Sequence, residues 1–218
     1  MWWLAIPVIV GVGKAVYDAV TEEDPPPPPR QKTILESNLE RLKRDLRYET
    51  GKKIAIMGQP GAGKSSLLKK MTNGEVVPLP VIGTNTDATD WSSDANCTLL
   101  SRYKGKVFAD VPGYDTQGHP ASVFHANFPF GDFDAFLFTF NGKLHGADEE
   151  IFQRAIRTGK PVCIARSFLD SLDEDEMRAA ECDIRQRLSL ANSVEFIFFS
   201  NRTGQGVRNV FLTLCPSE

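Results

Sequence analysis

Excess positive charge is missing from this sequence, and so are paired cysteines. The 218 residues contain 25 Lys and Arg against 28 Asp and Glu, which gives a formal net charge of −3. No global field therefore attracts the chain to nucleic acid, and we expect no nucleic-acid partner. The four cysteines lie far apart and form no CxxC pair. This spacing argues against a zinc site built on paired cysteines and indicates reduced thiols in a cytoplasmic protein.

A basic start and a small-residue cleavage site are also missing near the N-terminus, so we do not expect an exported signal peptide. Residues 1–20 begin instead with thirteen uncharged residues, MWWLAIPVIVGVG. Two interpretations stay open. The segment is either a membrane anchor, with Trp2 and Trp3 at the level of the headgroups, or a terminal helix that packs on the protein or on a partner. In the first case, a cytoplasmic domain would be anchored by its N-terminus.

Two further segments precede the main domain. Residues 21–32 contain an acidic triplet and five consecutive prolines, which predict a stiff polyproline linker. Residues 33–49 predict an amphipathic helix, because leucines recur at intervals of four, three and four residues: Leu35, Leu39, Leu42 and Leu46. We expect these leucines to pack against the following domain, and a short coiled coil in a dimer is the alternative.

Residues 50–218 alternate short apolar runs with polar or amphipathic segments. Strands are predicted at residues 53–57, 98–103, 107–110, 135–140, 162–166 and 195–200, with helices between most of them. Such alternation is typical of an α/β fold, in which helices cover both faces of a mostly parallel sheet. Only three residues separate the second and third runs, so these two strands should form an antiparallel hairpin. We therefore expect a three-layer domain whose six-stranded sheet has one antiparallel strand.

A phosphate-binding loop follows the first predicted strand. The segment fits GxxxxGK[ST] at every fixed position, and a helix is expected to begin at Ser66; the loop consists of Gly58, Gln59, Pro60, Gly61, Ala62, Gly63, Lys64 and Ser65. Glycines let the backbone curl so that several amide hydrogens point inward, and the helix N-terminus adds positive potential. Lys64 would bridge two phosphates, and Ser65 would ligate Mg²⁺. A simple strand-to-helix turn would need neither of these two side chains.

Two polar segments follow the loop. Residues 81–89 contain Thr84, Thr86 and Thr89, and Asp110-Val111-Pro112-Gly113 comes directly after the third predicted strand. As an isolated tetrapeptide DVPG is only a turn, but its position one hairpin downstream of a phosphate loop makes it a candidate part of the same site.

These motifs, in this order, resemble the G domains of the Ras-like superfamily of P-loop GTPases. Within it, GAGKSS, DVPG, Arg166–Asp170 and Phe199–Arg202 look most similar to the immunity-related GTPases and their bacterial relatives. The resemblance covers about residues 52–214 and implies that GTP, GDP and Mg²⁺ bind here. It also implies that Asp110 and a switch threonine, Thr84 or Thr89, hold Mg²⁺, and that the amide of Gly113 contacts the γ-phosphate.

The base-binding part of the resemblance is weaker. The family pattern is Asn/Thr-Lys-x-Asp, whereas this chain has Ser167-Phe168-Leu169-Asp170. Asp170 would read guanine, Phe168 would stack where the lysine stem lies, and Ser200 and Asn201 would meet the guanine oxygen through their amides. The alternative is that Asp170 merely caps the next helix.

The sequence lacks some of the side chains that usually catalyse GTP hydrolysis in Ras-like proteins. Tyr114 stands after Gly113, where Ras-like proteins have a glutamine, and no arginine occurs between residues 71 and 101. We therefore expect a switch protein with slow Mg²⁺-dependent GTP hydrolysis, helped by a second copy of the chain or by an activating protein at the switch face. His119 and His125 are expected to be solvated, and the phenylalanines of residues 127–134 form either a partner surface or core. The alternatives are a pseudo-GTPase scaffold that holds nucleotide without turnover, and an adenine-nucleotide enzyme.

Overall fold

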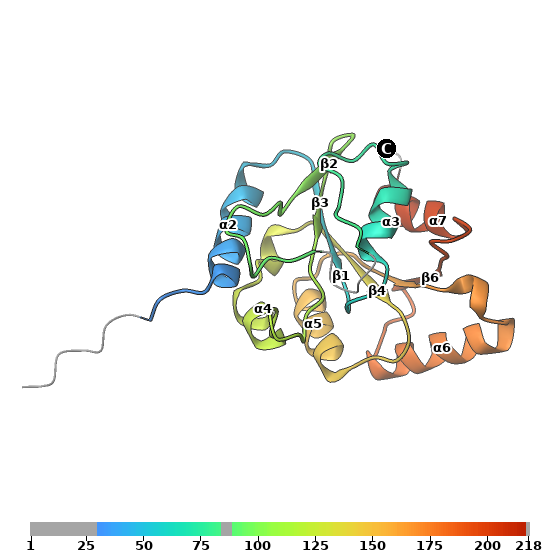
Figure 1. Cartoon of the computed structure of the whole chain (residues 1–218). Coiled ribbons are helices and arrows are strands. Elements are labelled where there is room, and N and C mark those ends of the chain that lie inside the picture. Colours follow the sequence, from blue (N-terminus) through green and yellow to red (C-terminus); the bar gives the residue numbers. More distant parts are fainter. Residues whose placement is uncertain (1–29, 84–88, 217–218) are drawn as a thin grey trace, which may run out of the picture. The chain divides into compact units, whose positions relative to one another are not determined.

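The computed structural model describes residues 30–83 and 89–216 (Figure 1). Its elements, in chain order, are α2 (Ile34–Tyr48), β1 (Lys52–Met57), α3 (Lys64–Met71), β2 (Ser101–Tyr103), β3 (Lys106–Asp110), α4 (Ala121–Asn127), β4 (Ala135–Phe140), α5 (Gly146–Ile156), β5 (Val162–Arg166), α6 (Glu174–Arg187), β6 (Glu195–Phe198) and α7 (Val207–Leu214). Short 3₁₀ turns occur at Phe130–Asp132 and Leu169–Ser171. The chain divides into two units, residues 1–31 and 32–218, and all of these elements belong to the second.

The six strands form one sheet in the order β2-β3-β1-β4-β5-β6. Every neighbouring pair is parallel except β2 with β3, which is the predicted hairpin. The side chains of β1 alternate between the two faces: Ala55 and Met57 lie in one buried cluster, while Ile54 and Ile56 lie in the other. The prediction of a mostly parallel α/β sheet with one antiparallel strand is confirmed.

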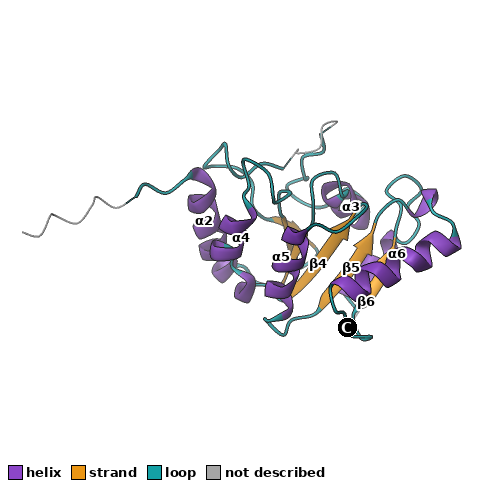
Figure 2. Ribbon diagram, turned by 90° about the horizontal axis from the view of Figure 1, so that it is seen from below, coloured by secondary structure: helices purple, strands orange, loops and turns teal. Residues whose placement is uncertain are grey.

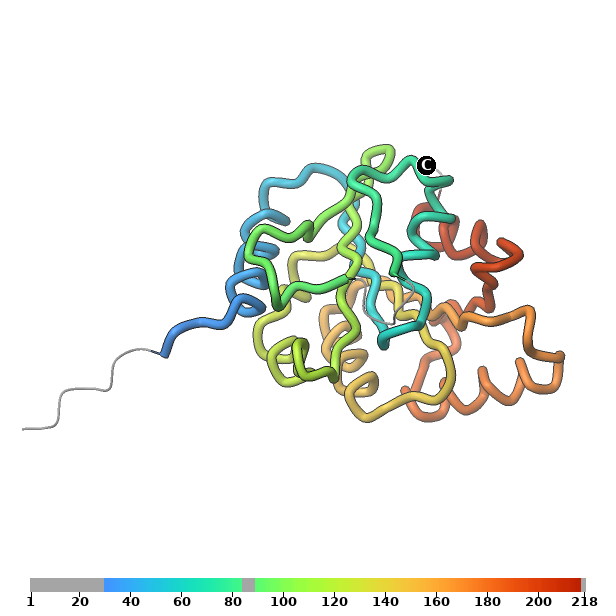
Figure 3. Tube along the Cα trace, in the orientation of Figure 1, coloured from blue at the N-terminus to red at the C-terminus, as the bar shows by residue number. Residues whose placement is uncertain are grey.

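Helices cover both faces of this sheet (Figure 2). The first cluster contains apolar side chains from α2, α4, α5 and α6, and the second contains those of α3 and α7. Helices α3 and α7 lie side by side although they are far apart in the sequence (Figure 3). The domain thus has the three expected layers.

Helix α2 is part of this packing. Its four periodic leucines are fully or almost fully buried in the first cluster, which confirms that they pack against the domain. Thr33 and Glu36 cap its N-terminus reciprocally, with the Thr33 amide donating to Glu36 Oε2 at 2.8 Å. The buried leucines tie this helix to the domain, and the cap fixes where the helix begins.

Two expectations need correction here. The phenylalanines at 128, 130 and 133 are buried, and the rings of Phe128 and Phe133 stack at 5.4 Å between centroids. Of the two interpretations of this segment, the partner surface is therefore wrong and the core is confirmed. The predicted strand at 98–103 shrinks to Ser101–Tyr103, since only these three residues pair with β3.

The predicted anchor at residues 1–20 and most of the predicted linker lie outside the described residues. Across residues 30–83 and 89–216, no helix combines the length and apolar character needed to cross a bilayer.

Candidate nucleotide site

The phosphate loop curls between the end of β1 and the start of α3. Gly58, Gly61 and Gly63 have φ angles of +138°, +72° and +88°, a region that L side chains rarely adopt. A Cβ on Gly58 would lie 2.0 Å from the carbonyl oxygen of Thr139, at the end of β4. Ala62 is buried, while Gln59 and Pro60 are half-buried. Backbone geometry, and not side-chain packing alone, therefore sets the shape of this loop.

Lys64, the first residue of α3, places its ammonium group inside the curl. Its Nζ donates to the carbonyl oxygens of Gly58 and Gln59, both at 2.9 Å. The side chain is only 6% exposed. A buried cation at the N-terminus of a helix creates a strongly positive site, which suits a polyphosphate.

Three oxygen-bearing side chains meet beside this lysine. Ser65 Oγ donates to Asp110 Oδ2 at 2.6 Å, and Thr89 Oγ1 donates to the same oxygen at 3.0 Å. The two hydroxyl oxygens are 3.3 Å apart. The structure thus joins the phosphate loop, the end of β3 and the segment after residue 88 at one point.

Asp110 is the acidic centre of this cluster. Burial raises the pKa of its carboxyl group, while the charge of Lys64 and the hydrogen bonds from Ser65 and Thr89 oppose that rise. Its second oxygen, Oδ1, is buried and has no hydrogen-bond partner within the described part of the chain. A carboxylate and two hydroxyls are hard oxygen donors of the kind that Mg²⁺ prefers, so the residues fit this ion.

The structure also locates most of the other predicted phosphate-site residues. Gly113 packs on the phosphate loop, because a Cβ there would lie 2.5 Å from Pro60 Cδ. Ser66 is half-buried and, with Asn201, lines a cavity of about 920 Å³ between α3 and α7. Thr84 lies outside the described residues, so only Thr89 of the two candidate switch threonines has a described position.

The predicted base loop lies at the ends of β5 and β6. Phe168 has a φ of +63° and is 48% exposed. The Asp170 carboxylate pairs with Arg202, and the pKa of Asp170 is lowered by a hydrogen bond with Ser200 and by Arg202, against the effect of burial. Asn201 Nδ2 donates to the carbonyl oxygen of Gly63 at 3.0 Å, which joins this loop to the phosphate loop.

Asp170 does not cap the next helix. The N-cap of α6 is Asp173, which accepts from the Glu176 amide at 2.8 Å. The helix-cap alternative for Asp170 is therefore wrong, and its carboxylate remains beside Ser200 in the base loop.

Sequence reasoning missed a buried carboxylate next to the phosphate loop. Asp148, at the start of α5, accepts from Tyr114 Oη at 2.9 Å and also from Gln59 Nε2. Burial raises the pKa of Tyr114 well above its ordinary value, and Asp148 adds to the rise. The position after Gly113 is thus tied to α5. The sequence does not predict this contact, because 34 residues separate Tyr114 from Asp148.

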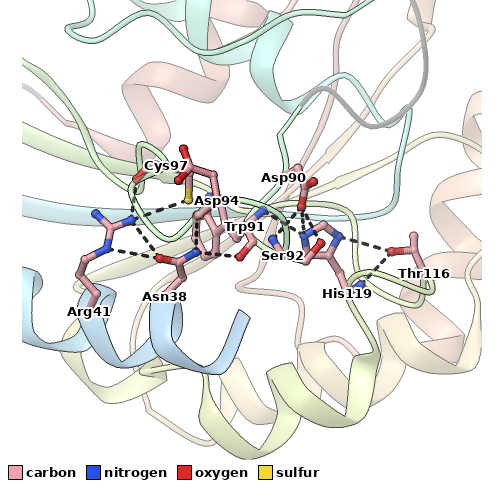
Figure 4. A network of polar contacts seen from close by, with 9 residues as sticks. All are labelled: Asn38, Arg41, Asp90, Trp91, Ser92, Asp94, Cys97, Thr116 and His119. Atoms are coloured by element: carbon pink, nitrogen blue, oxygen red, sulfur yellow. Dashed lines mark hydrogen bonds and ion pairs between the residues drawn. The ribbon is translucent and has the colours of Figure 1, made fainter. Parts of the chain in front are cut away.

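His119 was also misjudged. Its side chain is buried, and its Nε2 accepts from the Trp91 amide at 3.1 Å (Figure 4). His119 therefore has a structural role in the segment after Gly113, and the expectation that it is solvated is wrong. His125 is exposed, as expected.

Comparison with known proteins adds family evidence to this geometry. The family model described as "50S ribosome-binding GTPase" matches residues 53–167, more than half of the chain. GTPase Der of Streptococcus gordonii is 30% identical over 166 residues, which cover 70% of this chain and 36% of that relative. The chain therefore spans little more than a third of the length of this relative.

Two solved structures share the fold. Era in complex with MgGDPNP and a fragment of 16S ribosomal RNA has a TM-score of 0.56 and 19% identity, covering 78% of this chain and 59% of Era. A probable GTP-binding protein, EngB, has a TM-score of 0.54 and 16% identity, covering 74% of this chain and 96% of EngB. None of these three proteins is an immunity-related GTPase, so that narrower resemblance stays a prediction. The match over the phosphate loop, Asp110 and Gly113 shows that the chain belongs to the 50S ribosome-binding GTPase family.

Proposed function

We propose that this chain is a GTP-binding switch protein that hydrolyses GTP slowly with Mg²⁺. The observation that carries the proposal is the meeting of Ser65, Thr89 and Asp110 beside the phosphate loop. Family membership supports hydrolysis of GTP, and it gives no support to the pseudo-GTPase alternative.

Each residue has a proposed task. The loop amides of residues 58–63 and the Lys64 ammonium bind the phosphates, and the Gly113 amide contacts the γ-phosphate. Ser65, Asp110 and Thr89 would hold Mg²⁺, which neutralises charge on the phosphates when bound. Thr89, which already bonds to Asp110, is proposed as the switch threonine, and Thr84 lies outside the described residues. In hydrolysis, a water oxygen bonds to the γ-phosphorus while the bond from that phosphorus to the β–γ bridging oxygen breaks. The bridging oxygen keeps the electron pair and leaves as part of GDP, and the protons of the water go to the released inorganic phosphate and to solvent.

Guanine selection is assigned to Asp170, with Ser200 and Asn201 contacting the base oxygen. The carboxylate of Asp170 already lies in the base loop beside Arg202, and the half-exposed ring of Phe168 is available for stacking on a base. The narrower kinship with immunity-related GTPases rests on this loop together with GAGKSS, DVPG and Phe199–Arg202.

Turnover should be slow without help. The hydroxyl of Tyr114 is committed to Asp148, so this residue is not free to orient the attacking water as a glutamine would. A second copy of the chain or an activating protein is proposed to supply the missing groups. The expectation that nucleic acid is not a partner stays open, because the Era neighbour was crystallised with ribosomal RNA. A membrane role for residues 1–20 also stays a proposal.

The decisive experiment compares Lys64→Ala with Lys69→Ala, an exposed lysine on the same helix. Titration calorimetry with Mg²⁺ and GTP should show at least a 100-fold loss of affinity for the first variant and less than a threefold change for the second. Unchanged GTP affinity in Lys64→Ala would refute the phosphate-site assignment. A single-turnover rate no faster than in solution would leave only the scaffold alternative, and preferential binding of ATP would favour the adenine-nucleotide enzyme.

A further inference from the structure

A buried asparagine on α2 holds the backbone that follows the switch threonine. Asn38 is 1% exposed, and its Nδ2 donates to the carbonyl oxygens of Trp91 at 2.8 Å and Asp94 at 2.9 Å (Figure 4). Its Oδ1 accepts from Arg41 Nη2 at 3.1 Å. Both amide hydrogens and the amide oxygen are therefore used, which makes this contact strongly directional.

Arg41 adds a second anchor from the same helix. Its Nη2 also donates to the carbonyl oxygen of Cys97 at 2.6 Å. Two consecutive turns of α2 thus hold main-chain oxygens at residues 91, 94 and 97. Because these bonds reach the backbone, they fix the path of the segment whatever its side chains are.

Trp91 is held from the other side as well. Its amide donates to His119 Nε2 at 3.1 Å, and His119 belongs to the segment after Gly113. Its indole is fully buried in the cluster that contains the α2 leucines. The residue therefore connects α2 with both polar segments that border the phosphate site.

Thr89 lies only two residues before Trp91 and bonds to Asp110. A shift of the Trp91 peptide must move Thr89, because two residues of chain leave little slack. Helix α2 lies outside residues 53–167, the part matched by the family model, so the family match does not account for it.

We infer that Asn38 is a positioning residue, which fixes Thr89 beside Asp110 and so favours the GTP-bound state over the GDP-bound state. The inference rests on the proposed function. A contact that orders Thr89 helps the triphosphate more than the diphosphate, because only GTP has a γ-phosphate for the switch threonine to reach. A residue shifts the equilibrium between the GTP-bound and GDP-bound states only if it stabilises one of them more than the other.

The test uses the full chain and two Asn38 variants. Asn38→Ala removes the amide, and Asn38→Asp keeps its shape but loses both donors. We expect each to bind a non-hydrolysable GTP analogue with Mg²⁺ about tenfold more weakly, the effect of losing one or two hydrogen bonds, while GDP affinity changes less than twofold. The matched control is Leu39→Ala, which should lower the unfolding temperature and leave the GTP-to-GDP affinity ratio unchanged.

Trp91 supplies a second readout. The chain has three tryptophans, so a background with Trp2→Phe and Trp3→Phe leaves Trp91 as the only indole. Its fluorescence should differ between the analogue-bound and GDP-bound states, and Asn38→Ala should abolish that difference. Arg41→Ala, which removes the Cys97 anchor, should shift the affinity ratio in the same direction by a smaller factor and carries the test if neither Asn38 variant folds.

An unchanged GTP-to-GDP affinity ratio in the folded variants would overturn the inference, whether both affinities stay the same or both fall equally. These results differ from failure of the proposed function itself. In that case, the unmodified chain would bind neither GTP nor GDP.

Discussion

Gly58 offers the sharpest test of how the phosphate loop is built. Its φ of +138° is strained for any L side chain, and an added Cβ would lie 2.0 Å from the carbonyl oxygen of Thr139. That atom is backbone at the end of a central strand, so it cannot swing away as a flexible side chain could. Gly58→Ala must therefore displace the loop from the sheet.

Gly142 provides a matched control. Its φ of +111° is also in the left-handed half of the map, but a Cβ at this position would meet no other atom within 4 Å. The strain of a side chain at such a positive φ costs about 1–3 kcal/mol at either site. Overpacking adds about 1–3 kcal/mol at Gly58 alone. The two variants should thus differ in free energy of unfolding by roughly 1–3 kcal/mol, the overpacking contribution alone.

Urea denaturation without nucleotide measures the stability difference, and calorimetry with Mg²⁺ and GTP measures binding. We expect Gly58→Ala to lose at least 100-fold in affinity and Gly142→Ala to lose less than threefold. Equal destabilisation of the two variants would refute the claim that close approach of the loop to β4 shapes the cradle. So would normal GTP binding by Gly58→Ala.

Three further changes test other parts of the structure. Leu42→Ala should lower the free energy of unfolding by about 2–5 kcal/mol in urea denaturation, because Leu42 is fully buried between α2 and the domain; a cost below about 1 kcal/mol would contradict that packing. Asp170→Ala should reduce the preference for GTP over ATP in competition titrations, and an unchanged preference would place the base elsewhere. Burial raises the pKa of Asp90, but hydrogen bonds from Ser93 and Ser92 and the charge of the neighbouring His119 outweigh it and lower the pKa from 3.8 to about 2. A lowered folded-state pKa means that Asp90 contributes stability above about pH 4 that is lost as the pH falls towards 2. Asp90→Asn should therefore reduce the change in the free energy of unfolding between about pH 4 and pH 2, measured by urea denaturation at each pH; an unchanged dependence on pH would contradict this assignment.

The fold could be predicted well from the sequence because each strand is marked by a run of apolar residues within the strand itself. Apolar runs such as residues 135–140 correspond to β4 without any shift, since a central strand is buried on both faces and must be apolar throughout. The strand at 98–103 was too long in the prediction. Leu99 and Leu100 are buried, as strand residues often are, but their burial comes from packing in the core and not from pairing with β3.

Side-chain partners far apart in the sequence could not be predicted in the same way. The loop glycines and Lys64 follow a fixed spacing, so their proximity follows from the motif alone. The contact of Asn38 with Trp91 spans 53 residues, and the burial of His119 depends on the fold around it. A polar residue on the buried face of a helix is a weak signal that a distant partner exists, and Asn38 lies among the leucines of that face.

Under the proposed function, the buried carboxylate of Asp148 bears on the speed of switching. Gln59 comes from the phosphate loop and Tyr114 from the residue after Gly113, and both donate to this one side chain. Any movement of Gly113 that follows the loss of a γ-phosphate pulls on Tyr114. Breaking a buried hydrogen bond to a carboxylate costs about 1.5–3 kcal/mol, which slows such a movement by roughly 10- to 150-fold if nothing replaces the bond on the way. In the proposed switch, a partner that supplied a new acceptor for Tyr114 would remove this barrier, so the contact that takes Tyr114 away from the attacking water would also let such a partner speed the movement.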